Sequence, residues 1–247
     1  MPRLACQTIT WGRERLMNDY HQILKEVKSA GFEGVETNLT VLEKHRPNVS
    51  NWLQETELAL VAAHYSGDLL MEIPVEEQRR ILQWLAGLGT QFFLVSSSSS
   101  YDLRDFSRLA KFLTEFALRS QDVGIQVCFH HHDWELRDAN RALRHFLLES
   151  PHDVGIAVDF GWVLSAEVPM RDFLTMVASR MRYVHLKDSF QGHWTELGHG
   201  NLPVAEVLRQ IAPFNLPWWT TEQDTTTREP RLSVSSNAAF LRKFLAS

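Results

Sequence analysis

The chain has 247 residues, with 25 Lys plus Arg against 30 Asp plus Glu, which gives a formal net charge of −5 at pH 7. Its 44% hydrophobic and 22% charged residues are typical of a globular protein and exclude disorder over most of the chain. The two cysteines, Cys6 and Cys128, are far apart and form no CxxC motif, which argues against a disulfide framework or a cysteine-based zinc site. The acidic balance disfavours nucleic acid, and neither a membrane span nor a signal peptide is visible, so we expect a cytoplasmic protein.

Short apolar runs alternate with longer helical patterns along the chain. Strands are predicted at Leu4–Ile9, Gly34–Thr37, Leu58–Ala63, Phe92–Val95, Ile125–Phe129, Val154–Val158, Arg182–Leu186 and Trp218–Thr221. Short, continuous apolar runs of this kind are typical of parallel strands buried on both faces. Helices are predicted at Tyr20–Ala30, Asn51–Glu57, Val75–Leu88, Phe106–Ser120, Ala139–Leu148, Met170–Ala178, Val204–Ile211 and Ser236–Leu245. Asp102 and Ser236 are the predicted caps of two of these helices.

About eight strand-then-helix units in a chain of this length predict an α/β fold, a (β/α)8 TIM barrel. No Pro/Gly-rich linker divides the sequence, so we expect one domain over residues 1–247. A doubly wound sheet is the alternative, but it usually carries GxGxxG after the first strand, where this chain has Thr8–Gly12. A phosphate-binding GxxxxGK[ST] loop, an HExxH motif and a GxSxG motif are also absent.

Polar side chains follow most of the predicted strands. In strand order they are Trp11, Glu36 with Asn38, His64, Ser96, His130 with His132, Asp159, His185 with Lys187, and Glu222 with Asp224. In a (β/α)8 barrel these strand ends meet at the active-site mouth. Any one of these residues is equally explained as a helix cap or a surface charge, but a convergent set of histidines and carboxylates favours a functional site.

The run His130–Glu135 follows the fifth predicted strand. Side chains alternate along a strand, so His130 and His132 share a face, and the carboxylate of Glu135 follows at once. The run therefore favours metal binding or proton transfer, against the alternative of a hydrogen-bonded loop. Asp159, at the end of the sixth strand, supplies a hard oxygen ligand or else a turn residue.

The last two strand ends carry further candidates. His185 suits a divalent metal, and Lys187 on the same face can neutralise an oxyanion or else lie in solvent. Glu222 can ligate a metal and take a proton, or else cap the last helix. The loop residues Trp11, Phe160, Trp162 and Trp194 are suited to stacking on sugars or to core packing, and Ser96–Ser100 reads as a flexible loop or as hydroxyls that touch a polar ligand.

Together these segments resemble the xylose isomerase-like TIM barrel superfamily, which includes sugar phosphate isomerases and epimerases, inosose dehydratases and endonuclease IV. The resemblance is carried by Ala5–Gly12, Gly31–Glu36, His130–Glu135 (similar to H-N-H-D-x-E), Asp159–Trp162, His185–Asp188, Leu197–Asn201 and Glu222. It implies one divalent ion (Mn, Mg or Zn), held in the family by a Glu, an Asp, a His and a Glu after strands five to eight. Asp159, His185 and Glu222 match this pattern, and His130 stands where the family has the first Glu, so these four are the expected ligands.

The resemblance implies a metal-dependent isomerase or epimerase that acts on a sugar or polyol carbonyl compound through an enediolate. Glu222 or Glu135 would remove the proton, and Lys187 and His132 would steady the oxygen. The expected substrate-binding residues are Trp11, Glu36, His64 and Trp162. The expected partner is a small sugar or polyol, with self-association left open.

Three other functions were weighed against this one. Because His130 replaces one of the two glutamates that family epimerases use as bases, an inosose-type dehydratase is the second hypothesis. A sugar-binding barrel without activity is the third. An endonuclease IV-like nuclease is disfavoured, because Trp162 and Gly192–Trp194 stand where that family has metal ligands.

Overall fold

A computed structural model gives the fold and describes residues 1–246. Eight parallel strands form a closed barrel in the order β1-β10-β7-β6-β5-β4-β3-β2, which confirms the predicted fold class. The barrel strands are β1 (Arg3–Gln7), β2 (Gly34–Asn38), β3 (Ala59–Ser66), β4 (Phe92–Ser96), β5 (Gln126–His130), β6 (Gly155–Asp159), β7 (Met181–Leu186) and β10 (Trp218–Thr221). A small antiparallel hairpin of β8 (Asp188–Phe190) and β9 (His193–Thr195) follows β7 and was not predicted.

The predicted helices occur in the predicted order, and short helices occur in addition to them. The helices are α1 (Gly12–Asn18), α2 (Tyr20–Ala30), α3 (Leu39–Lys44), α4 (Arg46–Thr56), α5 (Gly67–Glu72), α6 (Val75–Gly87), α7 (Leu103–Gln121), α8 (Arg137–Glu149), α9 (Phe160–Ser165), α10 (Met170–Val177), α11 (Val204–Ile211) and α12 (Pro230–Leu245), with 3₁₀ turns η1 (Thr8–Trp11), η2 (Trp134–Leu136) and η3 (Ala212–Phe214). The additional short helices are α1, α3, α5 and α9. Asp102 caps α7 as predicted, in a capping box with Asp105. The predicted cap at Ser236 is wrong, because α12 begins at Pro230, whose fixed φ suits the first helical turn.

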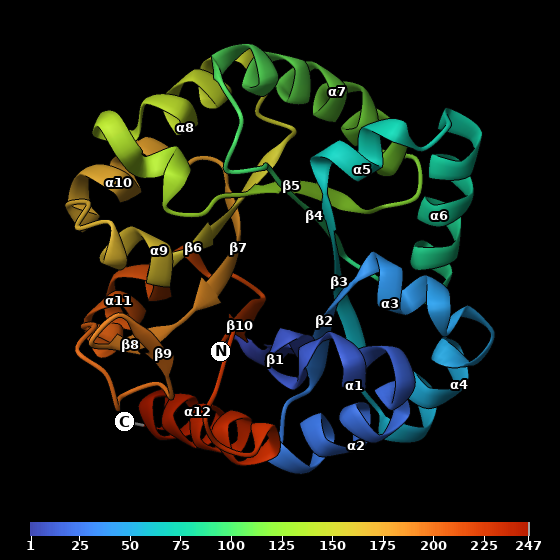
Figure 1. Ribbon diagram of the computed structural model, residues 1–247, viewed down its shortest axis with the longest axis vertical. Coiled ribbons are helices and arrows are strands. Elements are labelled where there is room, and N and C mark those ends of the chain that lie inside the picture. Colours follow the sequence, from blue (N-terminus) through green and yellow to red (C-terminus); the bar gives the residue numbers. More distant parts are fainter. Residues whose placement is uncertain (247) are drawn as a thin grey trace. The chain divides into compact units, whose positions relative to one another are not determined.

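The chain divides into two compact units, the first formed by Met1–Val61 with Val184–Ser247 and the second by Ala62–Tyr183. In the first unit, β1 pairs with β2 and β10, and β10 pairs with the end of β7. Helix α12 lies beside α2 (Figure 1), and the Arg242 guanidinium donates a hydrogen bond to the Ala30 carbonyl at 2.9 Å. The register sets Gln7 beside Glu36, so polar residues from neighbouring strands lie at one level.

In the second unit, β4 pairs with β3 and β5, and β5 pairs with β6. Helices α7 and α8 run side by side (Figure 1), and the Phe129 ring on β5 stacks on Phe146 of α8 at 4.1 Å. All five residues of β6 are buried, as expected for a parallel strand covered on both faces. The register places Ser66, Ser96 and His130 at one level at the carboxyl ends of their strands.

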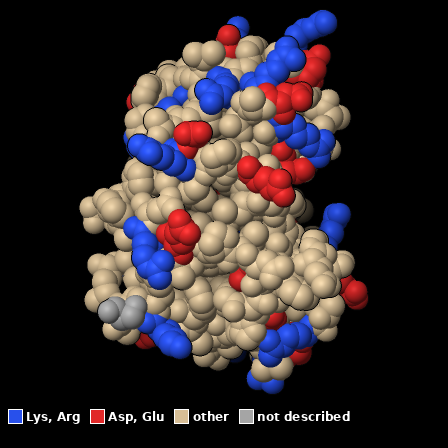
Figure 2. All heavy atoms as spheres, turned by 90° about the vertical axis from the view of Figure 1, so that its left-hand side faces the viewer, with Lys and Arg blue, Asp and Glu red and all other residues tan. Residues whose placement is uncertain are grey.

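Surface charge, helix length and the cysteines can each be described from the structure. On the face shown in Figure 2, acidic and basic side chains are interspersed, and the described residues form no continuous basic patch there. None of the described helices combines the length and the apolar character that a membrane crossing requires. Cys6 and Cys128 are buried free thiols, so the prediction that they form no disulfide is confirmed.

Candidate metal and proton-transfer site

His185 lies buried at the end of β7 in the first unit, with a carboxylate at each ring nitrogen. Its Nε2 is 2.6 Å from Glu36 Oε2, and its Nδ1 is 2.7 Å from Glu222 Oε2. Burial lowers the pKa of His185, but the charges of Glu36 and Glu222 and the hydrogen bonds to them outweigh it and raise that pKa well above its usual range. The raised pKa favours a protonated imidazole, which lies between the two carboxylates.

Lys187 extends this chain of charges. Its Nζ is 2.8 Å from Asp224 Oδ2, 3.4 Å from Glu222 Oε2 and 4.9 Å from the centre of the Trp194 ring. Its side chain is only 1% exposed, so the alternative of a solvated surface lysine is wrong. The Lys187 ammonium therefore contacts the carboxylates of both Glu222 and Asp224.

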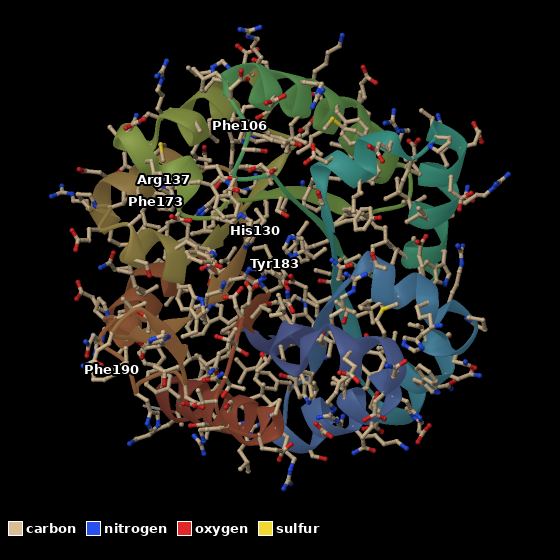
Figure 3. The ribbon with its side chains drawn as sticks, viewed as in Figure 1. Phe106, His130, Arg137, Phe173, Tyr183 and Phe190 are labelled. Atoms are coloured by element: carbon tan, nitrogen blue, oxygen red, sulfur yellow. The ribbon has the colours of Figure 1, made fainter. Side chains whose placement is uncertain are left out.

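His130 and Asp159 form a second histidine–carboxylate pair, within the second unit. His130 Nε2 is 3.5 Å from Asp159 Oδ2, and both side chains are buried. His64 packs beside them, with its ring centre 4.9 Å from that of His130 and its Nε2 3.3 Å from Ser96 Oγ. Figure 3 shows His130 toward the centre of the view, inside the helices that cover β5.

Two backbone contacts fix the position of Asp159. The Asp159 amide donates to His131 Nε2 at 3.2 Å, so His131, next to His130, connects the end of β5 to β6. Asp159 Oδ1 accepts from the Trp162 amide at 3.2 Å and caps α9. Sequence reasoning missed this role of Asp159, because α9 is a short helix that was not predicted. Sequence reasoning also missed the role of His131.

Glu135 connects the loop after β4 to the loop after β5 through two hydrogen bonds. One of its oxygens accepts from the Ser97 hydroxyl, and the other accepts from the His132 amide at 2.8 Å. Burial raises the pKa of Glu135 to about 7, although these hydrogen bonds lower it in part. The Trp134 indole donates to Ser97 Oγ at 3.1 Å, so part of the serine tract is held in place by the β5 loop.

Aromatic rings surround His132. The His132 ring stacks on Trp134 at 4.0 Å between ring centres, meets His130 edge-on at 4.8 Å, and lies 6.0 Å from Trp162. Trp11, in contrast, is buried, and its indole donates to Glu26 Oε2 of α2 at 2.6 Å. Substrate binding by Trp11, Glu36, His64 and Trp162 stays a prediction, while the structure gives Trp11 a hydrogen bond to Glu26 and Glu36 a histidine partner.

The four predicted metal ligands form one group. His130, Asp159, His185 and Glu222 are buried, and one ligand atom from each lies within 4.8 Å of all the others. Metal bonds of about 2.0–2.2 Å place opposite ligands about 4 Å apart, so the group is compact enough for one ion. Two imidazole nitrogens and two carboxylate oxygens fit a divalent ion such as Zn²⁺ or Mn²⁺. That they bind an ion stays a prediction.

Asp188, next to Lys187, organises the loop beyond the hairpin. Its carboxylate accepts hydrogen bonds of 2.8–3.1 Å from four backbone amides, those of Ser189, Gly198, Gly200 and Leu202. A Cβ on Gly200 would lie 2.2 Å from Asp188 Oδ1, so only glycine fits there. The segment Leu197–Asn201 is thus shaped around one carboxylate.

Comparison with known proteins places this geometry in a family. The family model for the xylose isomerase-like TIM barrel matches residues 24–244. An inosose dehydratase of Mesomycoplasma hyopneumoniae is 24% identical over 213 residues, which is 77% of this chain and 69% of that protein.

Two solved structures, both of sugar enzymes, share the fold. A sugar phosphate isomerase/epimerase from Parabacteroides distasonis has a TM-score of 0.81 at 13% identity, covering 98% of each chain. The 3-keto-D-glucoside 4-epimerase from E. coli has a TM-score of 0.76 at 19% identity, covering 98% of this chain and 100% of that one. At these identities the structures show the shared fold alone, but the family model spans most of the sequence. The chain therefore belongs to the xylose isomerase-like TIM barrel family.

Proposed function

We propose that the protein is a metal-dependent enzyme that removes the proton next to the carbonyl of a sugar or keto-polyol. As an isomerase it would return the proton to the neighbouring carbon, and as an epimerase to the opposite face of the same carbon. The observation that carries the proposal is a row of four buried side chains, each in contact with the next: Glu36, His185, Glu222 and Lys187. In this row His185 would be the metal-ligating imidazole, Glu222 the carboxylate base and Lys187 the cationic proton donor. Successive side chains lie 2.6, 2.7 and 3.4 Å apart. The matched proteins named above act on sugars or an inosose, which supports this substrate class.

The four-residue group fits the ion that the family implies. His130, Asp159, His185 and Glu222 would hold it, and a bound divalent ion polarises a carbonyl and its neighbouring hydroxyl, so that the α-hydrogen becomes acidic. Glu36 faces His185 Nε2, so Nδ1, which lies 2.7 Å from the fellow ligand Glu222, would be the atom that binds the ion. A carboxylate on the second nitrogen of a ligating histidine fixes its tautomer and orientation.

Proton transfer falls to groups of the first unit. Glu222 Oε2 faces His185 and Lys187, whereas Oε1 lies 3.5 Å from Gln7 Nε2, so the carboxylate can ligate through one oxygen and accept a proton through the other. The Lys187 ammonium neutralises charge on the substrate oxygen and can return the proton. In this proposal Glu135 holds the β5 loop, because it accepts hydrogen bonds from the Ser97 hydroxyl and the His132 amide.

Dehydration is the second candidate, and two observations favour it. The inosose dehydratase match extends over 213 residues, and Glu135, the other predicted base, is engaged in the loop contacts. Glu222 would again remove the α-proton, and Lys187 or His132 would then protonate the β-hydroxyl that leaves as water.

The test combines metal content with solvent exchange. Elemental analysis should find about one divalent ion per chain, and Asp159→Ala and His185→Ala should lose it, while His21→Ala, a histidine of α2 paired with Glu55, should keep it. Ketoses and an inosose are then incubated with the protein in D₂O. Deuterium at the α-carbon without loss of water supports an isomerase or epimerase, and loss of water supports the dehydratase. Tight binding without exchange or dehydration would overturn both.

A further inference from the structure

A second feature of the second unit lies beside the proposed reaction site. A cavity of about 490 Å³ is lined by three arginines, Arg104 of α7 and Arg137 and Arg141 of α8, and by the rings of Phe106 and Trp134. This volume is in the range that holds small-molecule ligands. Figure 3 shows Phe106 and Arg137 further out from the centre than His130.

The three arginines of this arginine cavity are exposed residues, and only one of them forms an ion pair with another described residue. Arg137 pairs with Asp133 at 2.8 Å, whereas Arg104 and Arg141 form no ion pair within residues 1–246. Two acidic residues also line the cavity. The Asp102 carboxylate is directed to the amides of Arg104 and Asp105 at the start of α7, and Asp138 lies on the exposed surface at the start of α8.

The backbone at this place is also unusual. Asp138, Ala139 and Asn140 have φ of 50°, 56° and 62°, which is the left-handed region that residues with a Cβ avoid. Their strained turn separates Arg137 from Arg141, and both side chains still line the same cavity. Strain of this kind is concentrated at ligand clamps and other functional sites.

None of the four proposed metal ligands lines the arginine cavity, but two ring contacts connect its wall to His130. Trp134 lines the cavity and stacks on His132 at 4.0 Å, and His132 meets His130 at 4.8 Å. A substrate of a few carbons whose carbonyl end lies at His130 would extend past His132 toward the arginines. Arginine forks bind the oxygens of phosphate and carboxylate groups with paired, charge-assisted hydrogen bonds.

We infer that the arginine cavity binds the phosphate or carboxylate group at the far end of the substrate. The assignment of this group to the substrate rests on the proposed function, but anion binding in the cavity is measurable without catalysis. The inference names an anionic sugar or polyol as the substrate class.

The test is calorimetric titration of the full chain with inorganic phosphate and, separately, with malonate, with and without added Mg²⁺. The variant Arg104→Gln/Arg141→Gln is compared with Arg108→Gln/Arg171→Gln, which removes the same charge at exposed positions outside the cavity lining. The first variant should bind the anion at least about 10-fold more weakly, since hydrogen bonds to charged groups contribute on this scale, and the control should bind as the unmodified chain does. Binding of phosphate alone identifies a phosphate site, and binding of malonate alone identifies a carboxylate site.

The inference is overturned if neither anion binds, or if both double variants bind equally well. If the anion binds in the cavity but no ketose or inosose exchanges a proton or loses water, the proposed function fails and the anion site stands. If an anionic substrate turns over and Arg104→Gln/Arg141→Gln leaves its KM unchanged, the assignment of the cavity to that substrate is wrong. The expected result is a KM raised at least about 10-fold with little change in kcat.

Discussion

Glu36 offers the sharpest test of the metal group, because it touches a proposed ligand without being one. Its carboxylate is buried 2.6 Å from His185 Nε2, on the side of the ring opposite Glu222. Glu36→Gln keeps the shape and an oxygen that can accept the Nε2 hydrogen bond, but it removes the negative charge. The ring should stay in place, while the imidazole becomes a weaker metal ligand.

The expected loss follows from the general behaviour of such partners. Removing a group that orients a metal-bound histidine costs about 10–100-fold in metal affinity, or about 1.4–2.7 kcal/mol. A second effect opposes it. Glu36 helps to raise the pKa of His185, so Glu36→Gln also lets the proton leave more easily and weakens its competition with the metal. The variant should therefore lose the most affinity at high pH and less of it as the pH falls.

The assay is a competition titration with a coloured zinc chelator at several pH values between 6 and 9. Glu26→Gln is the matched control, because Glu26 is another largely buried glutamate of the first unit, bound to Trp11 and Arg15 instead of His185. Metal affinity of Glu36→Gln that equals that of the unmodified chain at every pH, while Asp159→Ala loses the ion, would refute the role of Glu36. A loss of the same size in Glu26→Gln would mark the effect as general destabilisation.

Three further outcomes are expected. Glu222→Gln breaks buried contacts with His185 and Lys187 and should lower the free energy of unfolding by about 3–5 kcal/mol. In the protein that remains folded it should slow substrate proton exchange about 10²–10⁴-fold, and full exchange activity would exclude Glu222 as the base. Burial holds the pKa of Glu135 at about 7, above the ordinary 4.5, so its contribution to stability is complete below pH 4.5 and is lost as the pH rises through 7, by about 3 kcal/mol. In Glu135→Gln, the free energy of unfolding should not show this fall of about 3 kcal/mol between pH 4.5 and 8. If the free energies of unfolding of the variant and the unmodified chain change with pH in parallel, the prediction is wrong. Asp188→Ala leaves four amides without their acceptor and should cost about 2–3 kcal/mol, whereas a change in melting temperature below 2 °C would show that water replaces the carboxylate.

Much of the fold could be predicted because burial imposes simple patterns on this chain. Tyr20–Ala30 and Val204–Ile211 have the bounds that their apolar spacing predicts. The four proposed ligands could be named because each ends an apolar strand, where the barrel topology brings polar side chains to one mouth. Whether a residue ends a strand depends on its neighbours in the sequence, so it can be predicted from the sequence alone.

Contacts between distant segments could not be predicted in this way. Glu36 and His185 are 149 residues apart, and only the barrel register shows that one holds the other. The β8–β9 hairpin was missed because its strands have three residues each, although Gln191-Gly192, both with positive φ, is a signal for a two-residue turn. The arginine cavity left no sequence signal, because it depends on a turn with an unusual backbone at Asp138–Asn140.

The Asp188 clamp limits how this protein can vary. Four amides spread over residues 189–202 converge on one carboxylate, and Gly200 approaches it too closely for any side chain. A change in the length of the loop after Gly198, or a replacement of Gly200, would therefore break the hydrogen bonds of Asp188. Asp188 directly follows Lys187, so the position of the lysine would change as well. The exposed hairpin tip at Gln191–Gly192 is under no such limit, and it carries β9 with Trp194 over the lysine. We expect insertions that retune substrate choice to be tolerated at this tip, which makes it the natural place to graft new binding residues beside an unchanged lysine.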